Sequence, residues 1–277
     1  MRLDSWSDTN IGLIRKSNQD SVGCFPELSL FLVADGMGGR AQGEVASRMA
    51  VEIIHECFAD APTLRQAIKD AQTLKSGGFL RTLLRRPSPA EPEPDGEPVS
   101  PSERLRTAIE LANAKIFEAG HTGDGSPAQG SMGTTVVAIE CVLSQGRVYW
   151  AYVGDSRLYR IRDGDLALLT ADHTLLGEAF WNQENIPSDL PHTNRLMRAL
   201  GITPTVEVSL GSDAVRPGDL FLLCSDGVSG MVKPSDLLEE LSRHRPLEES
   251  GSALIQKALD AGGKDNASLL LVKIEGD

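Results

Sequence analysis

Residues 30–39 read Leu-Phe-Leu-Val-Ala-Asp-Gly-Met-Gly-Gly, an apolar run that ends in an acid and several glycines. An apolar run of this length, bounded by turn residues, predicts a strand at 28–34. The following segment, 44–58, has apolar residues near helical spacing and predicts an amphipathic helix. The glycines between them let the backbone approach a ligand or ion closely. Because the stretch lacks the Lys-Ser/Thr ending of a nucleotide P-loop, ATP binding is disfavoured.

Many short apolar runs and a few helices make up the rest of the chain. Short turns, including the hairpin signal Asp163-Gly164, imply antiparallel strand pairing. Regular strand–helix alternation is absent, so we expect a β-sandwich with helices packed outside. Another helix is predicted to begin at Ser100, with Pro101 in its first turn and Glu103 completing a capping box. The further strands are predicted at 135–142, 147–153, 157–161, 166–170, 206–210, 219–224 and 268–274, and the further helices at 100–118, 234–243 and 247–261.

Composition narrows the class of protein. The chain has 277 residues and a formal net charge of −12, which argues against nucleic acid as a partner. Such a protein can still hold phosphate where bound cations reverse the local field. No apolar run suits a signal peptide or a membrane span, and the four cysteines form no CxxC pair, so a cytoplasmic location is the default expectation. The Pro- and Glu-rich segment 76–102 is predicted to be a mobile surface insertion.

Four acids share one context at the ends of predicted strands. Asp35, Asp155 and Asp226 follow apolar strands, and Asp265 precedes one. A single Asp-Gly after a strand is usually a turn, but four such ends are harder to dismiss. Carboxylates that converge repel one another unless cations neutralise them, and hard oxygen ligands suit Mg²⁺ or Mn²⁺. The absence of a Cys/His cluster argues against zinc.

Six motifs in order carry a resemblance over nearly the whole chain. With them the sequence resembles the metal-dependent protein phosphatase family, the type 2C serine/threonine phosphatases, in its bacterial form. The resemblance implies an α+β fold, a four-layer αββα sandwich of two antiparallel sheets flanked by helices. It also implies one catalytic domain over 1–277, with a flap at about 172–203 beside the active site. The motifs are Gly12-Leu-Ile-Arg-Lys-Ser-Asn-Gln-Asp20, Val33-Ala-Asp-Gly-Met-Gly-Gly39 with Gly43-Glu-Val-Ala-Ser47, Met132-Gly-Thr-Thr135, Val153-Gly-Asp-Ser-Arg157, Leu223-Cys-Ser-Asp-Gly227 and Lys264-Asp-Asn266.

The resemblance also implies metal ligands. Asp35 would bridge two cations, Mn²⁺ or Mg²⁺, and the Gly36 carbonyl would bind one of them. Asp226 and Asp265 would complete the inner ligands, and Asp155 with Asp226 would hold a third, weaker metal. The implied reaction is hydrolysis of phosphoserine and phosphothreonine on proteins by a water that the two metals activate.

Other positions support or depart from this pattern. Arg15 matches the phosphate-binding arginine, Asp20 would hold metal-bound water, and Asn266 would orient its neighbour. The family usually has Glu where this chain has Gln19, which can bind water but adds no charge. It usually has His where this chain has Arg40, which cannot donate a proton and could contact phosphate instead.

The expected partners are phosphorylated proteins and an opposing serine/threonine kinase, and the protein is expected to be a monomer. Two alternatives stay open. Gln19 and Arg40 would suit a degenerate phosphatase that acts as a regulatory binding module. A small phosphate-ester hydrolase is the other alternative, depending on what the flap admits.

Overall fold

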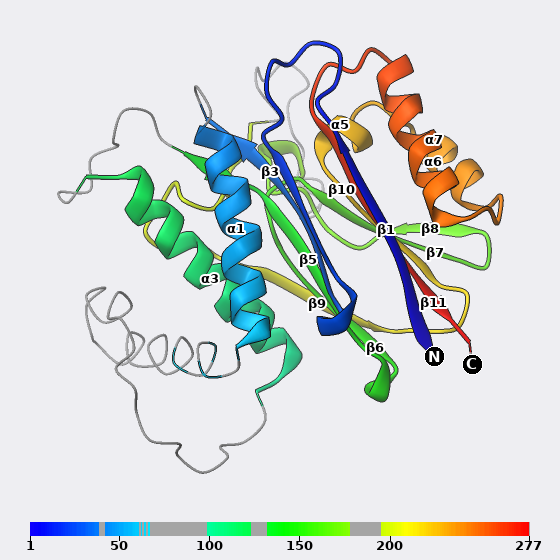
Figure 1. Ribbon diagram of the computed structural model, residues 1–277, viewed down its shortest axis with the longest axis horizontal. Helices are drawn as coiled ribbons and strands as arrows, with labels where there is room; N and C mark the ends of the chain where they lie inside the picture. Colours follow the sequence, from blue (N-terminus) through cyan, green and yellow to red (C-terminus); the bar gives the residue numbers. More distant parts are fainter. Residues whose placement is uncertain are drawn as a thin grey trace.

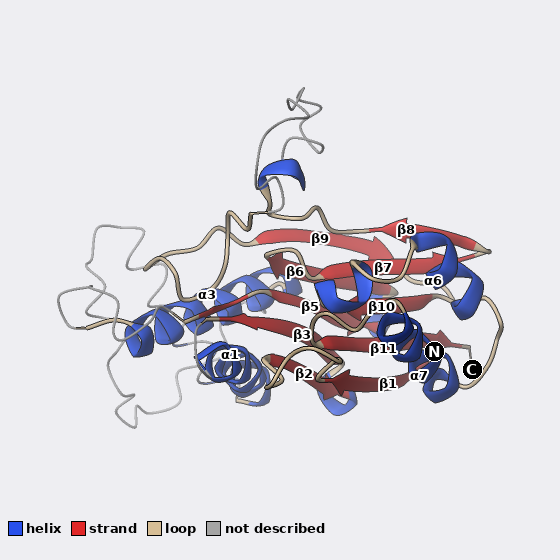
Figure 2. Ribbon diagram, turned by 90° about the horizontal axis from the view of Figure 1, so that it is seen from above, coloured by secondary structure: helices blue, strands red, loops and turns tan. Residues whose placement is uncertain are grey.

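Two antiparallel sheets stack face to face in the computed structural model, which describes residues 1–38, 42–60, 62, 64, 66, 99–122, 132–177 and 195–276 (Figures 1 and 2). We name the sheets after their central strands. The β10 sheet has the order β1 (Arg2–Asn10), β11 (Ala267–Glu275), β10 (Leu220–Cys224), β7 (Arg157–Arg162) and β8 (Asp165–Leu168). The β3 sheet has the order β2 (Asp20–Phe25), β3 (Leu30–Met37), β5 (Val136–Val142), β6 (Arg147–Val153) and β9 (Ser209–Ala214), and the short β4 (Gly133–Thr134) pairs with β3.

Helices cover both outer faces. Helices α1 (Gln42–Ala59) and α3 (Pro101–Gly120) pack on the β3 sheet, while α5 (Asp226–Ser229), α6 (Pro234–Leu241) and α7 (Leu247–Asp260) pack on the β10 sheet (Figure 2). The predicted cap of α3 is present, because the Ser100 hydroxyl accepts from the backbone N–H of Glu103 at 3.3 Å. This arrangement confirms the predicted αββα sandwich. No helix among the described residues is long and apolar enough to cross a membrane.

Strand β3 explains why its sequence is apolar without interruption. Leu30, Leu32 and Ala34 pack against α1 and α3, whereas Phe31 and Val33 point between the two sheets. A strand buried on both faces needs apolar residues at every position. The inner layer that Phe31 and Val33 join also holds residues of β10 and β11, so one continuous core fixes the ends of all three strands relative to one another.

Four strands differ from the prediction, among them the two-residue strand β4, which was not predicted. β1 and β2 were not predicted, because each alternates polar and apolar residues on a sheet edge and contains no long apolar run. β9 was predicted at 206–210 but lies at Ser209–Ala214, where its partner β6 provides the pairing. The hairpin signal at 163–164 was correct: both residues have positive φ, 52° and 81°, and they join β7 to β8.

A buried ion pair fastens α3 to the β3 sheet. Glu140 on β5 is buried and pairs with Arg104 of α3. Arg104→Met is expected to lower the free energy of unfolding by about 2 kcal/mol, because it leaves a buried carboxylate without a counter-charge. The effect is at the low end for such pairs because 33% of the Arg104 side chain is exposed. Urea unfolding measures it, and the double variant Arg104→Met/Glu140→Leu should recover most of the loss; no recovery would contradict the ion-pair explanation.

Candidate active site

A cavity of about 320 Å³ opens at the end of the sandwich where strands from both sheets finish, at the top of Figure 1. β3 and β10 run toward this end and β11 starts from it. These strand directions therefore bring together, at one end of the sandwich, four acids that are up to 230 residues apart in the chain. Its described lining residues are Arg15, Gln19, Asp35, Gly36, Met37, Gly38, Thr135, Asp155, Leu196, Asp226, Asp265 and Asn266.

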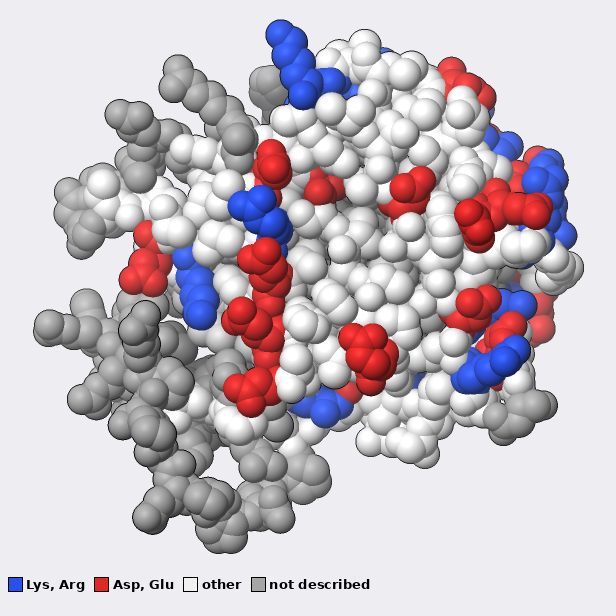
Figure 3. All heavy atoms as spheres, viewed as in Figure 1, with Lys and Arg blue, Asp and Glu red and all other residues white. Residues whose placement is uncertain are grey.

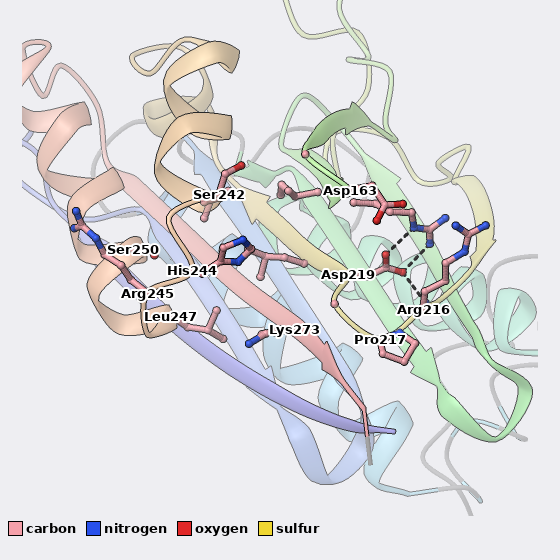
Figure 4. Close-up of a pocket in the computed structure, with 16 residues that line it drawn as sticks. Asp163, Arg216, Pro217, Asp219, Ser242, His244, Arg245, Leu247, Ser250 and Lys273 are labelled. Carbon is pink, nitrogen blue, oxygen red and sulfur yellow. Dashed lines mark hydrogen bonds and ion pairs between the residues drawn. The ribbon is translucent and has the colours of Figure 1, made fainter.

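A larger cavity, of about 470 Å³, lies at the opposite ends of β7, β10 and β11 (Figure 4). Its central acid, Asp219, is already neutralised, because Arg162 donates to both carboxylate oxygens at 2.6 Å and the Arg216 N–H donates at 2.7 Å. None of the four converging acids lines it. Size therefore does not identify the active site here; the convergence of acids does.

Burial and mutual repulsion dominate the electrostatics of the smaller cavity. Burial, with repulsion from Asp20, Asp226 and Asp155, raises the pKa of Asp35 well above its usual range. Burial, with repulsion from Asp226, raises the pKa of Asp155 to about 6. Burial and repulsion from Asp265 likewise raise the pKa of Asp226. The cavity therefore brings together more carboxylates than can stay ionised without a positive charge bound beside them.

The backbone around Asp35 is fixed by hydroxyl groups. The Asp35 N–H donates to Thr135 Oγ1 at 3.0 Å, and the Asp35 carbonyl accepts from Thr134 Oγ1 at 2.9 Å. Thr135 Oγ1 in turn contacts the buried Ser156 Oγ at 2.7 Å, next to Asp155. These contacts tie the end of β3 to the turn after β6, so two of the acids are positioned by one network.

Gly36 is required by close packing. A Cβ at this position would lie 2.1 Å from the Gly43 carbonyl oxygen and 2.5 Å from the Gln19 carbonyl oxygen. Both neighbours are backbone atoms that cannot move aside cheaply. The glycine therefore lets the end of β3, the start of α1 and the loop before β2 meet at the cavity.

The loop between β1 and β2 brings Arg15 to the cavity. The Arg15 guanidinium donates to the Asp265 carboxylate, and this hydrogen bond raises the arginine pKa. Asn266 holds the loop in place, because its side-chain N–H donates to the carbonyls of Ile11 (2.9 Å) and Ser17 (3.0 Å). It contacts Asp265 through its backbone N–H, at 2.8 Å, and not through its side chain.

The turn that carries Asp155 is held by the start of the flap. The Gly154 N–H donates to Nδ1 of the buried His173 at 3.0 Å, and His173 Nε2 contacts Ser209 Oγ at 3.0 Å. Burial lowers the pKa of His173 to about 4, so the imidazole is neutral and Nδ1 can accept. Arg157 adds a two-point ion pair with Asp172 at 2.7 and 2.9 Å.

The other predicted positions fall in three places. Asp20 lies beneath the cavity and does not line it; it pairs with Asp35 across β2 and β3, and Ser225 Oγ donates to it at 2.8 Å. Gln19 does line the cavity, with its amide 3.4 Å from the Gly38 carbonyl. Arg40, residues 76–98 of the insertion and the middle of the flap lie outside the described residues. Thr135, Ser156 and Leu196 are site residues that were not predicted as such.

The residues present fit divalent cations. Apart from Arg15, every charged side chain that lines the cavity is a carboxylate, the ligand type that Mg²⁺ and Mn²⁺ prefer. One oxygen of the buried Asp20 carboxylate has no hydrogen-bond partner. Among the described residues, no three acidic, histidine or cysteine side chains already form a cage for one ion. Instead, the Arg15 guanidinium contacts Asp265, and the raised pKa of Asp35 favours its protonated form where a cation would otherwise supply positive charge.

The pH dependence of stability should reveal this repulsion. The pKa of Asp20 is raised by burial from 3.8 to about 7, so the folded state binds this proton more tightly than the unfolded state. Its contribution to stability is full below about pH 4 and is lost as the pH rises to about 7. With chelator present, the melting temperature is expected to fall over this range, and Mn²⁺ should raise it most at the upper end. A melting temperature that rises with pH in chelator would contradict the assignment.

The comparisons with known proteins agree with the fold and the motifs. A profile of the protein phosphatase 2C family matches residues 15–266. The serine/threonine phosphatase stp of Listeria monocytogenes is 33% identical over 271 residues, which cover 96% of this chain and 93% of the relative. The crystal structure of the Mycobacterium tuberculosis serine/threonine phosphatase PstP/Ppp has a TM-score of 0.75 at 30% identity and is covered fully, as is this chain. The catalytic domain of PstP in complex with two manganese ions has a TM-score of 0.73 at 28% identity, with 99% of each chain covered.

These matches extend over nearly the whole chain and both sheets of the sandwich. They include every segment that contributes a described residue to the acidic cavity, from Arg15 to Asn266. The chain therefore belongs to the protein phosphatase 2C family, the type 2C serine/threonine phosphatases that its motifs resemble.

Proposed function

We propose that the protein removes phosphate from phosphoserine and phosphothreonine on proteins, at the cavity that holds Asp35, Asp226 and Asp265, and that it opposes a serine/threonine kinase. The observation that carries this proposal is the convergence of four carboxylates and one arginine on a single cavity. The carboxylates suit cations and the guanidinium suits phosphate oxygens. We further propose that the protein acts as a monomer in the cytoplasm.

Two divalent cations, Mn²⁺ or Mg²⁺, would be held by Asp35, Gly36, Asp226 and Asp265. Bound there, they supply hydroxide near neutral pH by lowering the pKa of water. The side chains and carbonyls of the protein would hold the cations in position. Asp35 would contribute to both cation positions, as the family resemblance implies, and the Gly36 carbonyl would act as a neutral ligand. Asp155 would join Asp226 at a third, weaker position.

Arg15 would bind the phosphate group. Its present partner is the Asp265 carboxylate, an anion that resembles phosphate in offering paired oxygens. With a cation held by Asp265, the guanidinium would be free to donate to the phosphate oxygens, and these hydrogen bonds would strengthen as charge develops during the reaction. Asp20 and Gln19 would orient water around the cations.

Substitution of Arg15 tests this role. Arg15→Ala is expected to lower kcat/KM for a phosphothreonine peptide by about 10²-fold, because two charge-assisted hydrogen bonds to phosphate are lost. Mn²⁺ affinity, measured by calorimetry, should stay the same or rise, since Asp265 loses a competing cation. Arg15→Lys should restore only part of the activity because it lacks the planar fork. An Arg15→Ala variant that loses its metals would instead make Arg15 a structural residue.

The decisive experiment compares substrates. Purified protein with Mn²⁺ should release phosphate from phosphoserine and phosphothreonine peptides faster than from small phosphate esters. The reverse order would favour a small-ester hydrolase. If calorimetry shows no Mn²⁺ binding and no peptide is cleaved, the protein is a binding module. Gln19, which lines the cavity without adding charge, motivates that alternative.

A further inference from the structure

The exposed apolar side chains gather beside the active site. Nine large apolar side chains of the described residues are exposed, and all except Met1 and Leu168 lie either in the loop that carries Arg15 or in the two described ends of the flap, one of which carries Leu196. Single exposed apolar residues are ordinary, whereas a group around one site marks a surface that binds a partner. The seven are Ile11, Leu13 and Ile14 in the loop between β1 and β2, and Leu175, Leu176, Met197 and Ile202 at the described ends of the flap. We call these seven residues the apolar rim.

The first side of the rim stands on a fixed backbone. The Leu13 N–H donates to the Gly263 carbonyl at 2.7 Å, and Asn266 holds the loop on either side of it. Although the backbone is held, the Leu13 and Ile14 side chains are 65% and 68% exposed. They directly precede Arg15, so two apolar side chains stand within two residues of the proposed phosphate ligand.

The second side of the rim is anchored through the flap. The Met197 N–H donates to the His173 carbonyl at 2.7 Å, and Thr174 bridges to Leu196. Leu196 lines the cavity, and the next residue, Met197, is 54% exposed. Seen from the cavity end, the loop joining β1 to β2 and the short helical turn at the start of the flap lie on different sides of the sandwich (Figure 2). Each part of the rim therefore adjoins a residue that lines the cavity, Arg15 in the first part and Leu196 in the second.

None of the seven rim residues is charged, so solvation of charge does not explain why they are exposed. The acids at the cavity face one another and Arg15, whereas the rim residues contribute no charge of their own. In an extended substrate, residues lie about 3.3 Å apart along the chain. Side chains one or two positions from a phosphorylated residue bound at Arg15 would therefore lie about 3–7 Å from it along the substrate, the same scale as the one- or two-residue separation of Ile14 and Leu13 from Arg15.

We propose that the apolar rim binds the substrate segment on either side of the phosphorylated residue, and that it favours phosphoserine and phosphothreonine flanked by aliphatic or aromatic side chains. This inference rests on the proposed function and names a substrate class for the same site. The rim is continuous with that site through Arg15 and Leu196. Protein segments fit it, because a small ester is too short to reach the rim.

The test compares two phosphothreonine peptides of equal length and charge, one with leucine and valine beside the phosphothreonine and one with serine and glutamine. With Mn²⁺, kcat/KM should be about tenfold higher for the apolar peptide, through a lower KM, because one buried aliphatic side chain contributes about this much. In the variant L13S/I14S the ratio between the peptides should fall toward one. Hydrolysis of p-nitrophenyl phosphate, which has no flanking chain, reports whether that variant is folded and active.

Leu168→Ser is the matched control, since Leu168 is an exposed leucine on β8 outside the rim, and it should keep the wild-type ratio. Equal kcat/KM for both peptides in the wild type would overturn the proposal, as would a preference that survives in L13S/I14S. A dimer that dissociates in L13S/I14S, seen by sedimentation velocity, would also overturn it and make the rim a contact between copies. If the ester is cleaved and neither peptide is, the proposed function itself fails, a result distinct from a lack of preference between peptides.

Discussion

Removal of divalent cations by a chelator is expected to lower phosphopeptide hydrolysis by at least about 10³-fold, or about 4 kcal/mol of transition-state stabilisation. The described lining of the cavity offers no other ready nucleophile. Cys57, Cys141 and Cys224 are buried elsewhere, and burial raises each thiol pKa to about 12. The Ser156 hydroxyl is buried against Thr135, without a basic partner. Apart from the carboxylates, which the proposed function assigns to the cations, water is the remaining attacking group, and the cations would lower its pKa.

Return of Mn²⁺ after dialysis should restore the rate. The dependence of the rate on Mn²⁺ concentration should give the affinity of the more weakly bound of the two essential cations. The control is circular dichroism in chelator, which should show that the fold persists. Full activity in chelator would contradict the metal-dependent mechanism. In that case a phosphoenzyme, trapped by acid quench with labelled substrate, would point to an aspartate as the nucleophile.

The fold was predictable from the sequence wherever burial dictates composition. Strand β3 is buried on both faces and its apolar run could be identified directly, and the same holds for β10 and β11. The caps and periodicity of α1 and α3 placed both helices within two residues of their observed bounds. β1 and β2 could not be found in this way, because an edge strand exposes one face and depends on its neighbour for pairing.

The candidate site was predictable only as far as strand ends reveal it. The positions of Asp35, Asp226 and Asp265 follow from apolar strands that stop or start beside an acid, and the structure brings these acids to one cavity. The contact between Thr135 and Ser156 joins residues 21 positions apart, one just before β5 and the other just before β7, so no local pattern signals it. Likewise, nothing in the sequence shows that Arg15 pairs with Asp265, 250 residues away, because that contact depends on tertiary packing.

Substitution of Asp35 by asparagine separates the two consequences of the acidic cluster. Asp35→Asn keeps the shape of the side chain but removes the charge that would bind both cations. We expect kcat for a phosphothreonine peptide to fall by at least about 10³-fold, and calorimetry should show weaker Mn²⁺ binding. The asparagine amide is close in shape to the carboxyl group and is neutral, as Asp35 is when protonated, so the fold should persist.

Without metal, the same variant is expected to be more stable than the wild type near neutral pH. Burial and three neighbouring carboxylates disfavour the ionised form of Asp35, and a neutral amide removes that repulsion. Thermal unfolding in chelator measures the gain, which should vanish at acidic pH, where Asp35 is protonated anyway.

Asp163→Asn is the matched control: Asp163 is exposed in the β7–β8 turn with φ of 52°, which asparagine tolerates, so neither activity nor stability should change. An Asp35→Asn variant that is less stable than the wild type in chelator would mean that Asp35 holds the fold together. A more stable and inactive variant would mean that the protein sacrifices stability at this position to keep a site for cations.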